Sequence, residues 1–123
     1  VECCPERTEV CFPPPERPFV CAVNEFLLTA MQSFRRPVPD TWQSEERYQT
    51  MERTLDRGWK GLDARGARDL LAGRKGFLCQ YDRGSGHGTV WSVVYDLSGG
   101  TLWRAEGDLS CCPFQPLPLP RSE

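Results

Sequence analysis

Apolar and polar residues alternate in two short runs near the start of the chain. "TEVCF" (8–12) alternates from residue to residue, and "PFVCAV" (18–23) resumes the apolar pattern after the proline loop "PPPER". We predict two short strands here, because prolines do not suit a strand interior. The second run stops at Asn24, a residue that also suits a strand end exposed to water. The segment 26–34 lacks a clean period and is expected to be irregular or a helical turn.

Two helices are predicted in the middle of the chain. The first covers about residues 41–57, with Asp40 or Thr41 as its N-cap. The second begins after Asp63 and ends before Gly73, which suits the position after a helix C-terminus. The apolar residues expected to face inward are Tyr48, Met51 and Leu55 in the first helix and Ala67, Leu70 and Leu71 in the second.

The last third of the chain returns to strand patterns. We predict strands over 76–81, 89–96 and 101–107, the last two joined as a hairpin by the turn "LSGG". Both faces of 89–96 are mainly apolar, so this strand is expected to be covered on both sides. The glycine-rich "DRGSGHG" between the first two strands favours a flexible hairpin connection over a phosphate-binding loop, because it leads into a strand and not a helix.

This order of elements indicates the α+β class, with antiparallel sheets and helices on one side. A chain of 123 residues fits one domain, predicted over residues 1–110. Residues 111–123 are rich in proline and are predicted to be an extended tail, which could also offer a polyproline ligand to a partner.

Composition and charge exclude several function classes. The net charge of −2 does not suit a nucleic-acid binder, and no apolar run approaches the length of a membrane span. The first residues are acidic and lack the apolar core of a signal peptide. We predict no cofactor, no partner nucleic acid and no membrane contact.

The seven cysteines allow two interpretations. Their number is odd and two pairs are adjacent in the sequence, Cys3–Cys4 and Cys111–Cys112, which favours a reduced, cytoplasmic protein over a secreted disulfide scaffold. No pair has the spacing of a zinc knuckle, so no metal site is predicted. The only histidine, His87, lies near Ser85 in a loop, and the carboxylates of 45–56 suit the solvated face of a helix.

Four motifs occur in an order that resembles a known family. "VECCP" resembles a "VVE-x-x-P" strand, "AVNEF" a strand ending in "TN-H-F", "SEER" an "S-x-x-R" helix start, and "TVWSVVYD" a "T-V-x-S-V-V-x-D" hairpin strand. Over roughly residues 1 to 107 the chain is similar to the C-terminal part of the isopenicillin-N acyltransferase-like, autoproteolytic N-terminal-nucleophile (Ntn) hydrolases.

The resemblance implies an αββα sandwich and amide chemistry. In that family a cysteine freed by self-cleavage attacks an acyl group, and the asparagine that matches Asn24 donates its side-chain N–H to the oxyanion. An arginine near the pocket is also implied, and the match allows either Arg47 or Arg83. Glu25 stands where the family usually has histidine, beside the oxyanion donor.

The nucleophile of the family lies upstream of the "VVE" strand, so it has no counterpart in this sequence. Cys3 and Cys4 lie inside that strand and not at a cleavage junction. We therefore expect an Ntn-type segment that is inactive alone, completed by self-association or by a partner chain. The alternative is a non-enzymatic binding or oligomerisation domain derived from the same fold.

Overall fold

The computed structural model describes residues 1–82, 84 and 86–119, and its internal contacts divide the chain into two units, Val1–Trp59 and Lys60–Glu123. The residue pattern predicts one domain over residues 1–110, whereas the boundary between the units falls inside that range. Both units combine helices with antiparallel strands, so the fold class is α+β. In the part of the chain that the structure describes, no helix has the length and apolar character needed to span a membrane.

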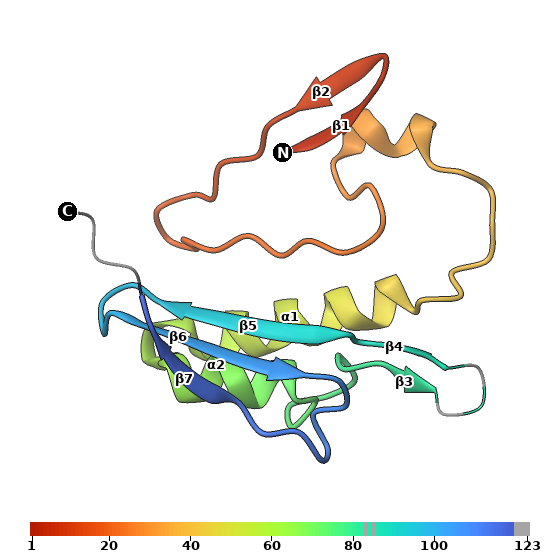
Figure 1. The fold of residues 1–123 in the computed structure, drawn as a ribbon. Coiled ribbons are helices and arrows are strands. Elements are labelled where there is room, and N and C mark those ends of the chain that lie inside the picture. Colours follow the sequence, from red (N-terminus) through yellow and green to blue (C-terminus); the bar gives the residue numbers. More distant parts are fainter. Residues whose placement is uncertain (83, 85, 120–123) are drawn as a thin grey trace. The chain divides into compact units, whose positions relative to one another are not determined.

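The first unit begins with a short hairpin of β1 (Glu2–Cys4) and β2 (Arg7–Glu9), visible in red in Figure 1. Glu2 pairs with Glu9 and Cys4 with Arg7. The hairpin contacts the 3₁₀ helix η1 (Thr29–Phe34), whose Met31 is fully buried. The helical turn expected within residues 26–34 is therefore confirmed.

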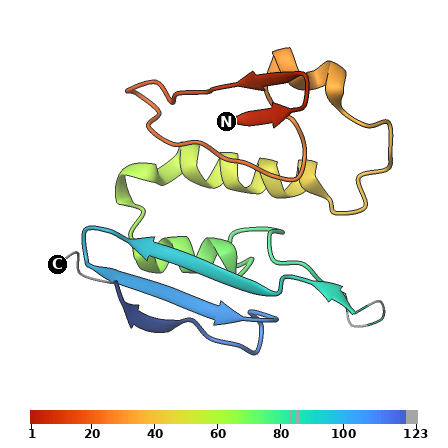
Figure 2. The same cartoon turned by 45° about the horizontal axis from the view of Figure 1, so that its top comes forward.

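The strand predicted over residues 18–23 is wrong. This segment is extended but pairs with no described strand, and it runs along helix α1 (Ser44–Gly58) in Figure 2. Its alternation is real: Cys21 is buried, whereas Val20 on the opposite side is exposed. The apolar side of the segment is therefore covered without any strand partner. Burial, followed by the nearby Glu52, raises the pKa of the Cys21 thiol to about 12.

Three hydrogen bonds tie the residues at the two ends of this segment to α1. Arg17 Nε donates to Asp56 Oδ1 at 2.6 Å, and Arg17 Nη2 donates to Glu52. These two carboxylates, Asp56 first, raise the pKa of the Arg17 guanidinium. At the other end of the segment, Arg47 Nη2 donates to Asn24 Oδ1 at 2.6 Å. Side chains of the helix thus fix the segment near both of its ends.

Helix α1 begins at Ser44, three residues after the predicted start at about residue 41. The Asp40 carboxylate accepts from the backbone N–H of Ser44 at 2.8 Å and of Glu45 at 3.0 Å. These bonds lower the pKa of Asp40, because they favour its charged form. The N-cap position itself is held by Gln43, with a left-handed φ of 49°. The prediction that Asp40 or Thr41 is the N-cap residue is therefore wrong, although the Asp40 side chain binds the first N–H groups of the helix from three residues before the N-cap. A short 3₁₀ turn, η2 (Trp59–Gly61), follows α1.

The second unit contains helix α2 (Ala64–Leu71) and a three-stranded sheet. Asp63 caps α2 by accepting from the N–H of Gly66 at 2.7 Å, and Gly73 follows the helix with φ 75°, both as predicted. The sheet has the order β5 (Trp91–Asp96), β6 (Thr101–Glu106), β7 (Gln115–Pro118), and both pairings are antiparallel. The predicted hairpin of β5 and β6 is confirmed.

Two segments of this unit differ from their predictions. The strand expected over 76–81 is reduced to β3 (Tyr81–Asp82), which pairs with β4 (His87–Gly88). The predicted tail 111–123 contributes β7, an edge strand that prolines tolerate because one side of an edge needs no donor. Residues 115–118 therefore belong to the sheet.

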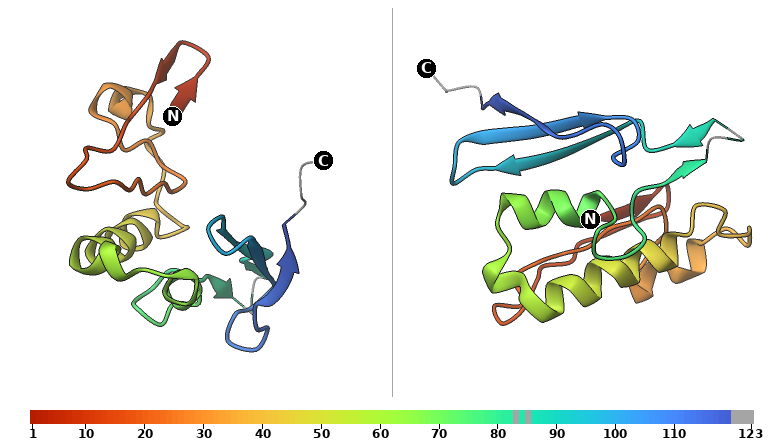
Figure 3. Two further views of the ribbon diagram at one scale, coloured as in Figure 1. Left: turned by 90° about the vertical axis from the view of Figure 1, so that its left-hand side faces the viewer. Right: turned by 90° about the horizontal axis from the view of Figure 1, so that it is seen from below.

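The two faces of the sheet have different environments. Helix α2 covers one face, as Figure 3 shows, and Leu70, Ala105 and Leu109 are buried in this unit. On the opposite face Trp91 is 58% exposed and Tyr95 63% exposed. The prediction that strand 89–96 is covered on both sides is therefore wrong. The prediction that helices lie on one side of the sheet agrees with the structure.

Candidate functional site

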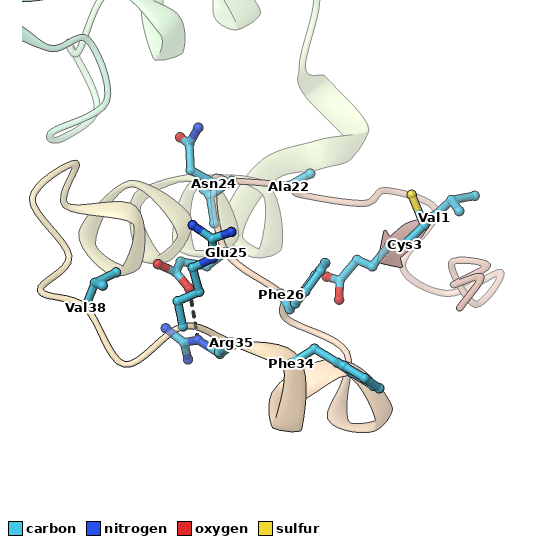
Figure 4. A pocket seen from close by; sticks show the side chains of 12 residues that line it. Val1, Cys3, Ala22, Asn24, Glu25, Phe26, Phe34, Arg35 and Val38 are labelled. Carbon is cyan, nitrogen blue, oxygen red and sulfur yellow. Dashed lines mark hydrogen bonds and ion pairs between the residues drawn. The ribbon is translucent and has the colours of Figure 1, made fainter. Parts of the chain in front are cut away.

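The candidate site is a cavity of about 440 Å³ in the first unit, shown in Figure 4. Its walls come from β1, the end of the extended segment, and the end of η1 with the loop that follows. The lining residues are Val1, Glu2, Cys3, Ala22, Val23, Asn24, Glu25, Phe26, Phe34, Arg35, Arg36 and Val38.

Asn24 is held by the helix and not by a strand. Its Oδ1 accepts from Arg47 Nη2, and Arg47 is itself fixed by donating Nε to the Trp42 carbonyl at 2.9 Å and Nη2 to Ser44 Oγ at 3.2 Å. A guanidinium can only donate, so the amide oxygen must be the atom that faces Arg47. The Asn24 NH₂ group is thereby oriented away from Arg47, with two N–H donors, and no described residue accepts from it.

Glu2 links strand β1 to the loop around Leu27 and Leu28, next to the cavity. One carboxylate oxygen accepts from the backbone N–H of Leu27 at 2.6 Å, and the other accepts from Leu28 at 3.1 Å. These bonds join the first strand to a loop 25 residues later in the sequence. Because both oxygens accept from backbone N–H groups, Glu2 acts as a structural clamp between β1 and this loop.

The charged side chains of the cavity are arranged around one ion pair. Arg35 Nε donates to Glu25 Oε2 at 2.9 Å, drawn as a dashed line in Figure 4. Arg36 also lines the cavity and brings a second guanidinium. The aromatic rings of Phe26 and Phe34 supply the apolar wall. With Glu2 included, two carboxylates and two guanidinium groups line the cavity, and a ligand with an apolar body and a polar group that contacts Arg36 matches this lining.

Cys3 lies in the cavity but does not face the asparagine. In Figure 4 the Cys3 thiol is beside Val1, and the Asn24 amide points away from it. A nucleophile must lie where the carbonyl it attacks can also reach the oxyanion donor. Cys3 and Asn24 therefore do not form such a pair in this structure, and Cys4 is not among the lining residues.

The structure brings together three of the four predicted site residues. Asn24 and Glu25 line the cavity, and Arg47 contacts it through Asn24. Arg83, like Ser85, lies outside the described residues. Sequence reasoning missed Glu2, Arg35 and Arg36; the dibasic pair before "PVPD" was the only available signal for the two arginines, and Glu2 gave none.

Metal ligands are not gathered in this protein within the residues that the structure describes. No group of three or more histidine, cysteine, aspartate or glutamate side chains is placed to hold an ion there. All seven cysteines are free thiols.

Comparisons with protein-family models, with curated proteins and with solved structures found no match to this chain. The resemblance to the Ntn hydrolases therefore stays a prediction that depends on the four motifs.

Proposed function

We propose that the chain is the oxyanion-donor segment of an Ntn-type amide hydrolase or acyltransferase, within an αββα sandwich. Asn24 is the donor, and the nucleophilic cysteine is supplied by another segment. The observation that supports this proposal most is the bond from Arg47 to Asn24 Oδ1, because it fixes the amide oxygen and leaves the N–H groups, which point away from Phe26 and Phe34 in Figure 4, without an acceptor among the described residues.

A fixed donor of this kind suits acyl transfer. Negative charge develops on the carbonyl oxygen as an amide is attacked, and one preorganised side-chain donor contributes about 2.7–4 kcal/mol to the transition state. Asn24 needs no rearrangement to donate, since Arg47 already occupies the other end of its amide group. Arg47 is thus a positioning residue, and Asn24 is the catalytic residue of the proposal.

The lining favours an amide with an apolar ring and a carboxylate. Phe26 and Phe34 form the apolar wall, and Arg36 supplies positive charge beside the Arg35–Glu25 pair. N-phenylacetylglycine is a suitable probe, because it contains a ring, an amide and one carboxylate.

Calorimetric titration with this probe tests the site. We expect binding that Asn24→Ala weakens several-fold, through the lost hydrogen bond to the amide carbonyl. Gln49→Ala on α1 is the matched control and should leave binding unchanged, because Gln49 contacts Glu45 and not the cavity. Binding that Asn24→Ala does not affect would rule out the donor role.

A turnover assay tests the missing nucleophile. The chain alone should release no product from a panel of fluorogenic acyl amides. Turnover that depends on Asn24 would show that the nucleophile lies within this chain, which contradicts the proposal.

A second candidate function, a binding or oligomerisation domain, is favoured by the exposed sheet face. Trp91 and Tyr95 lie together on the side of β5 opposite to α2, and Leu117 of the edge strand β7 is 45% exposed. Exposed apolar patches of this kind commonly mark interaction surfaces. Arg104 and Glu106 form an ion pair on β6 at 2.8 Å, so the strand beside this patch carries balanced charge, which suits a second copy of the same chain.

We further expect the protein to act in a reducing compartment such as the cytoplasm. The seven free thiols support this expectation. A thiol titration of the denatured protein without reductant should detect all seven, and a lower number would favour the disulfide-linked alternative.

A further inference from the structure

The second unit contains a pair of thiols that the proposed function does not use. Cys111 and Cys112 lie in a tight turn after β6, with their Sγ atoms 3.7 Å apart. Asp108 builds this turn: its carbonyl accepts from the backbone N–H of Cys111 at 3.1 Å and of Cys112 at 2.8 Å. Its carboxylate accepts from the N–H of Ser110 at 2.9 Å. The two thiols are thus held on the same side of the backbone.

The other adjacent pair of cysteines has no such geometry. Cys3 and Cys4 lie in strand β1, and side chains of consecutive strand residues point to opposite faces. Cys3 lines the cavity of the first unit, whereas Cys4 does not. The Cys–Cys dipeptide therefore occurs twice in this protein. At residues 111–112 the two thiols lie close together, and at residues 3–4 they point to opposite faces of the strand.

Two cavities lie beside the Cys111–Cys112 pair and share Cys112 in their linings. One, of about 400 Å³, is lined by Cys112 together with Arg65, Arg68 and Arg74, and its only carboxylate is Asp69. The other, of about 530 Å³, is lined by both Cys111 and Cys112. Cys112 lines both cavities, whereas the exposed Cys111 lines only the second, so a small disulfide whose carboxylates bind in the arginine-lined cavity reaches Cys111 by extending past Cys112, whose Sγ lies 3.7 Å from Cys111 Sγ.

The arginines make this cavity an anion site. Arg74 donates to Asp69 at 2.7 Å. Arg68 donates Nε to the Ala64 carbonyl at 3.1 Å and lies over the Trp103 ring at 3.7 Å, so both side chains are held in place. Three guanidinium groups against one carboxylate leave an excess of positive charge. Carboxylates bind well to such groups, because the planar fork donates two parallel hydrogen bonds.

We propose that Cys111 and Cys112 form a thiol–disulfide exchange site for small disulfides that carry carboxylates, which bind in the arginine-lined cavity. The Cys111 thiolate attacks one sulfur of the small disulfide, forms a mixed disulfide and releases one small thiolate, which takes up a proton. The Cys112 thiol then loses its proton and attacks Cys111 Sγ, releasing the second small thiol. The two protein thiols lose two electrons, and the small disulfide gains them.

The order of the two cysteines follows from their surroundings. Cys111 is the more exposed of the two thiols. The contact of Cys112 with Cys111 raises the pKa of the Cys112 thiol, so Cys112 keeps its proton more readily. Cys111 therefore reacts first and Cys112 resolves the mixed disulfide. Consecutive Cα atoms are closer than in an ordinary disulfide, so the product is strained and easily reduced. The exchange is thus reversible.

Mass spectrometry of the full chain tests the site, with oxidised glutathione as the anionic disulfide and cystamine as the cationic one. The peptide containing residues 111–112 should lose two hydrogens, and faster with oxidised glutathione than with cystamine. Cys112→Ser should stop the reaction at a glutathionyl adduct on Cys111. Oxidation that maps to Cys3 and Cys4 at the same rate would overturn the proposal.

A charge-reducing variant separates the anion site from simple thiol reactivity. In Arg65→Gln/Arg74→Gln, the preference for oxidised glutathione over cystamine should fall several-fold. Lys75→Gln removes a neighbouring positive charge that does not line the cavity, and it should leave the preference nearly unchanged. An unchanged preference in the double variant, or an equal loss in Lys75→Gln, would overturn the role of the cavity.

Discussion

The two units of this protein are stabilised in different ways. In Lys60–Glu123, an antiparallel sheet with a defined register packs on one helix around Leu70 and Ala105. In Val1–Trp59 the paired strands are three residues long, and much of the unit is fixed by side chains that bond to distant backbone or side-chain groups. The candidate site lies in Val1–Trp59, where single polar contacts determine the orientation of a side chain.

The largest expected effect is on the core of Lys60–Glu123. Leu70→Ala should lower the free energy of unfolding by about 2–5 kcal/mol, because it leaves a cavity beneath the sheet. Leu97→Ala, at a turn position that is 79% exposed, should change it by less than about 0.5 kcal/mol. Urea unfolding measures both. Hydrogen exchange compares the two units in Leu70→Ala, and amide protection should fall mainly in Lys60–Glu123. An equal loss of amide protection in Val1–Trp59 would show that the two units unfold as one.

The second prediction concerns the exposed sheet face. If a second copy covers it, light scattering should show a dimer at micromolar concentration, and Trp91→Glu should convert it to a monomer, because a buried unpaired charge is costly. Val90→Glu is the matched control: Val90 is 76% exposed and directly precedes Trp91, and side chains of consecutive residues in extended backbone point to opposite sides. A wild-type monomer, or dissociation by both variants alike, would contradict this assignment.

The third prediction tests the polar fixation of Val1–Trp59. Glu2→Gln replaces one acceptor oxygen by a donor facing a backbone N–H, and should cost about 1–3 kcal/mol. Glu6→Gln, in the exposed turn of the same hairpin, should have little effect. Amide exchange at Leu27 and Leu28 is the measurement, and unchanged protection in Glu2→Gln would show that the loop does not need the clamp.

The smallest effect is expected at the start of α1. Asp40→Asn keeps an acceptor oxygen but removes the negative charge near the helix N-terminus, and should cost about 0.3–1 kcal/mol at neutral pH. The pKa of Asp40 is lowered in the fold, so its contribution is complete above the ordinary aspartate pKa and disappears as the pH falls through the folded value. The stability difference between wild type and variant should therefore vanish in acid. A difference that persists there would mean that the cap does not depend on charge.

The regular elements were predictable because their signals are local. The cap at Asp63, the glycine after α2 and the alternation of β5 and β6 each lie within a few residues of the element they define. The strand predicted over 18–23 failed for the same reason. Alternation reports that one side is buried, but not whether a strand or a helix covers it.

Most of the candidate site could not be read from local patterns. Glu2 reaches Leu27 and Leu28, and Arg47 reaches Asn24 across 23 residues, so neither contact leaves a mark in a short window of sequence. Asn24 and Arg47 were named together only through the resemblance. Arg35 and Arg36 stand in a dibasic pair that has no distinctive spacing.

The central claim is that Arg47 holds the Asn24 amide ready to donate, and side-chain NMR tests it most directly. In Arg47→Gln the Asn24 NH₂ resonances should shift and average, and affinity for N-phenylacetylglycine should fall. Arg53→Gln is the matched control, since Arg53 lies on the same helix and donates to the Gln49 carbonyl. We expect Arg53→Gln to leave the Asn24 NH₂ resonances and the affinity for N-phenylacetylglycine unchanged. Unchanged Asn24 resonances and affinity in Arg47→Gln would contradict the account.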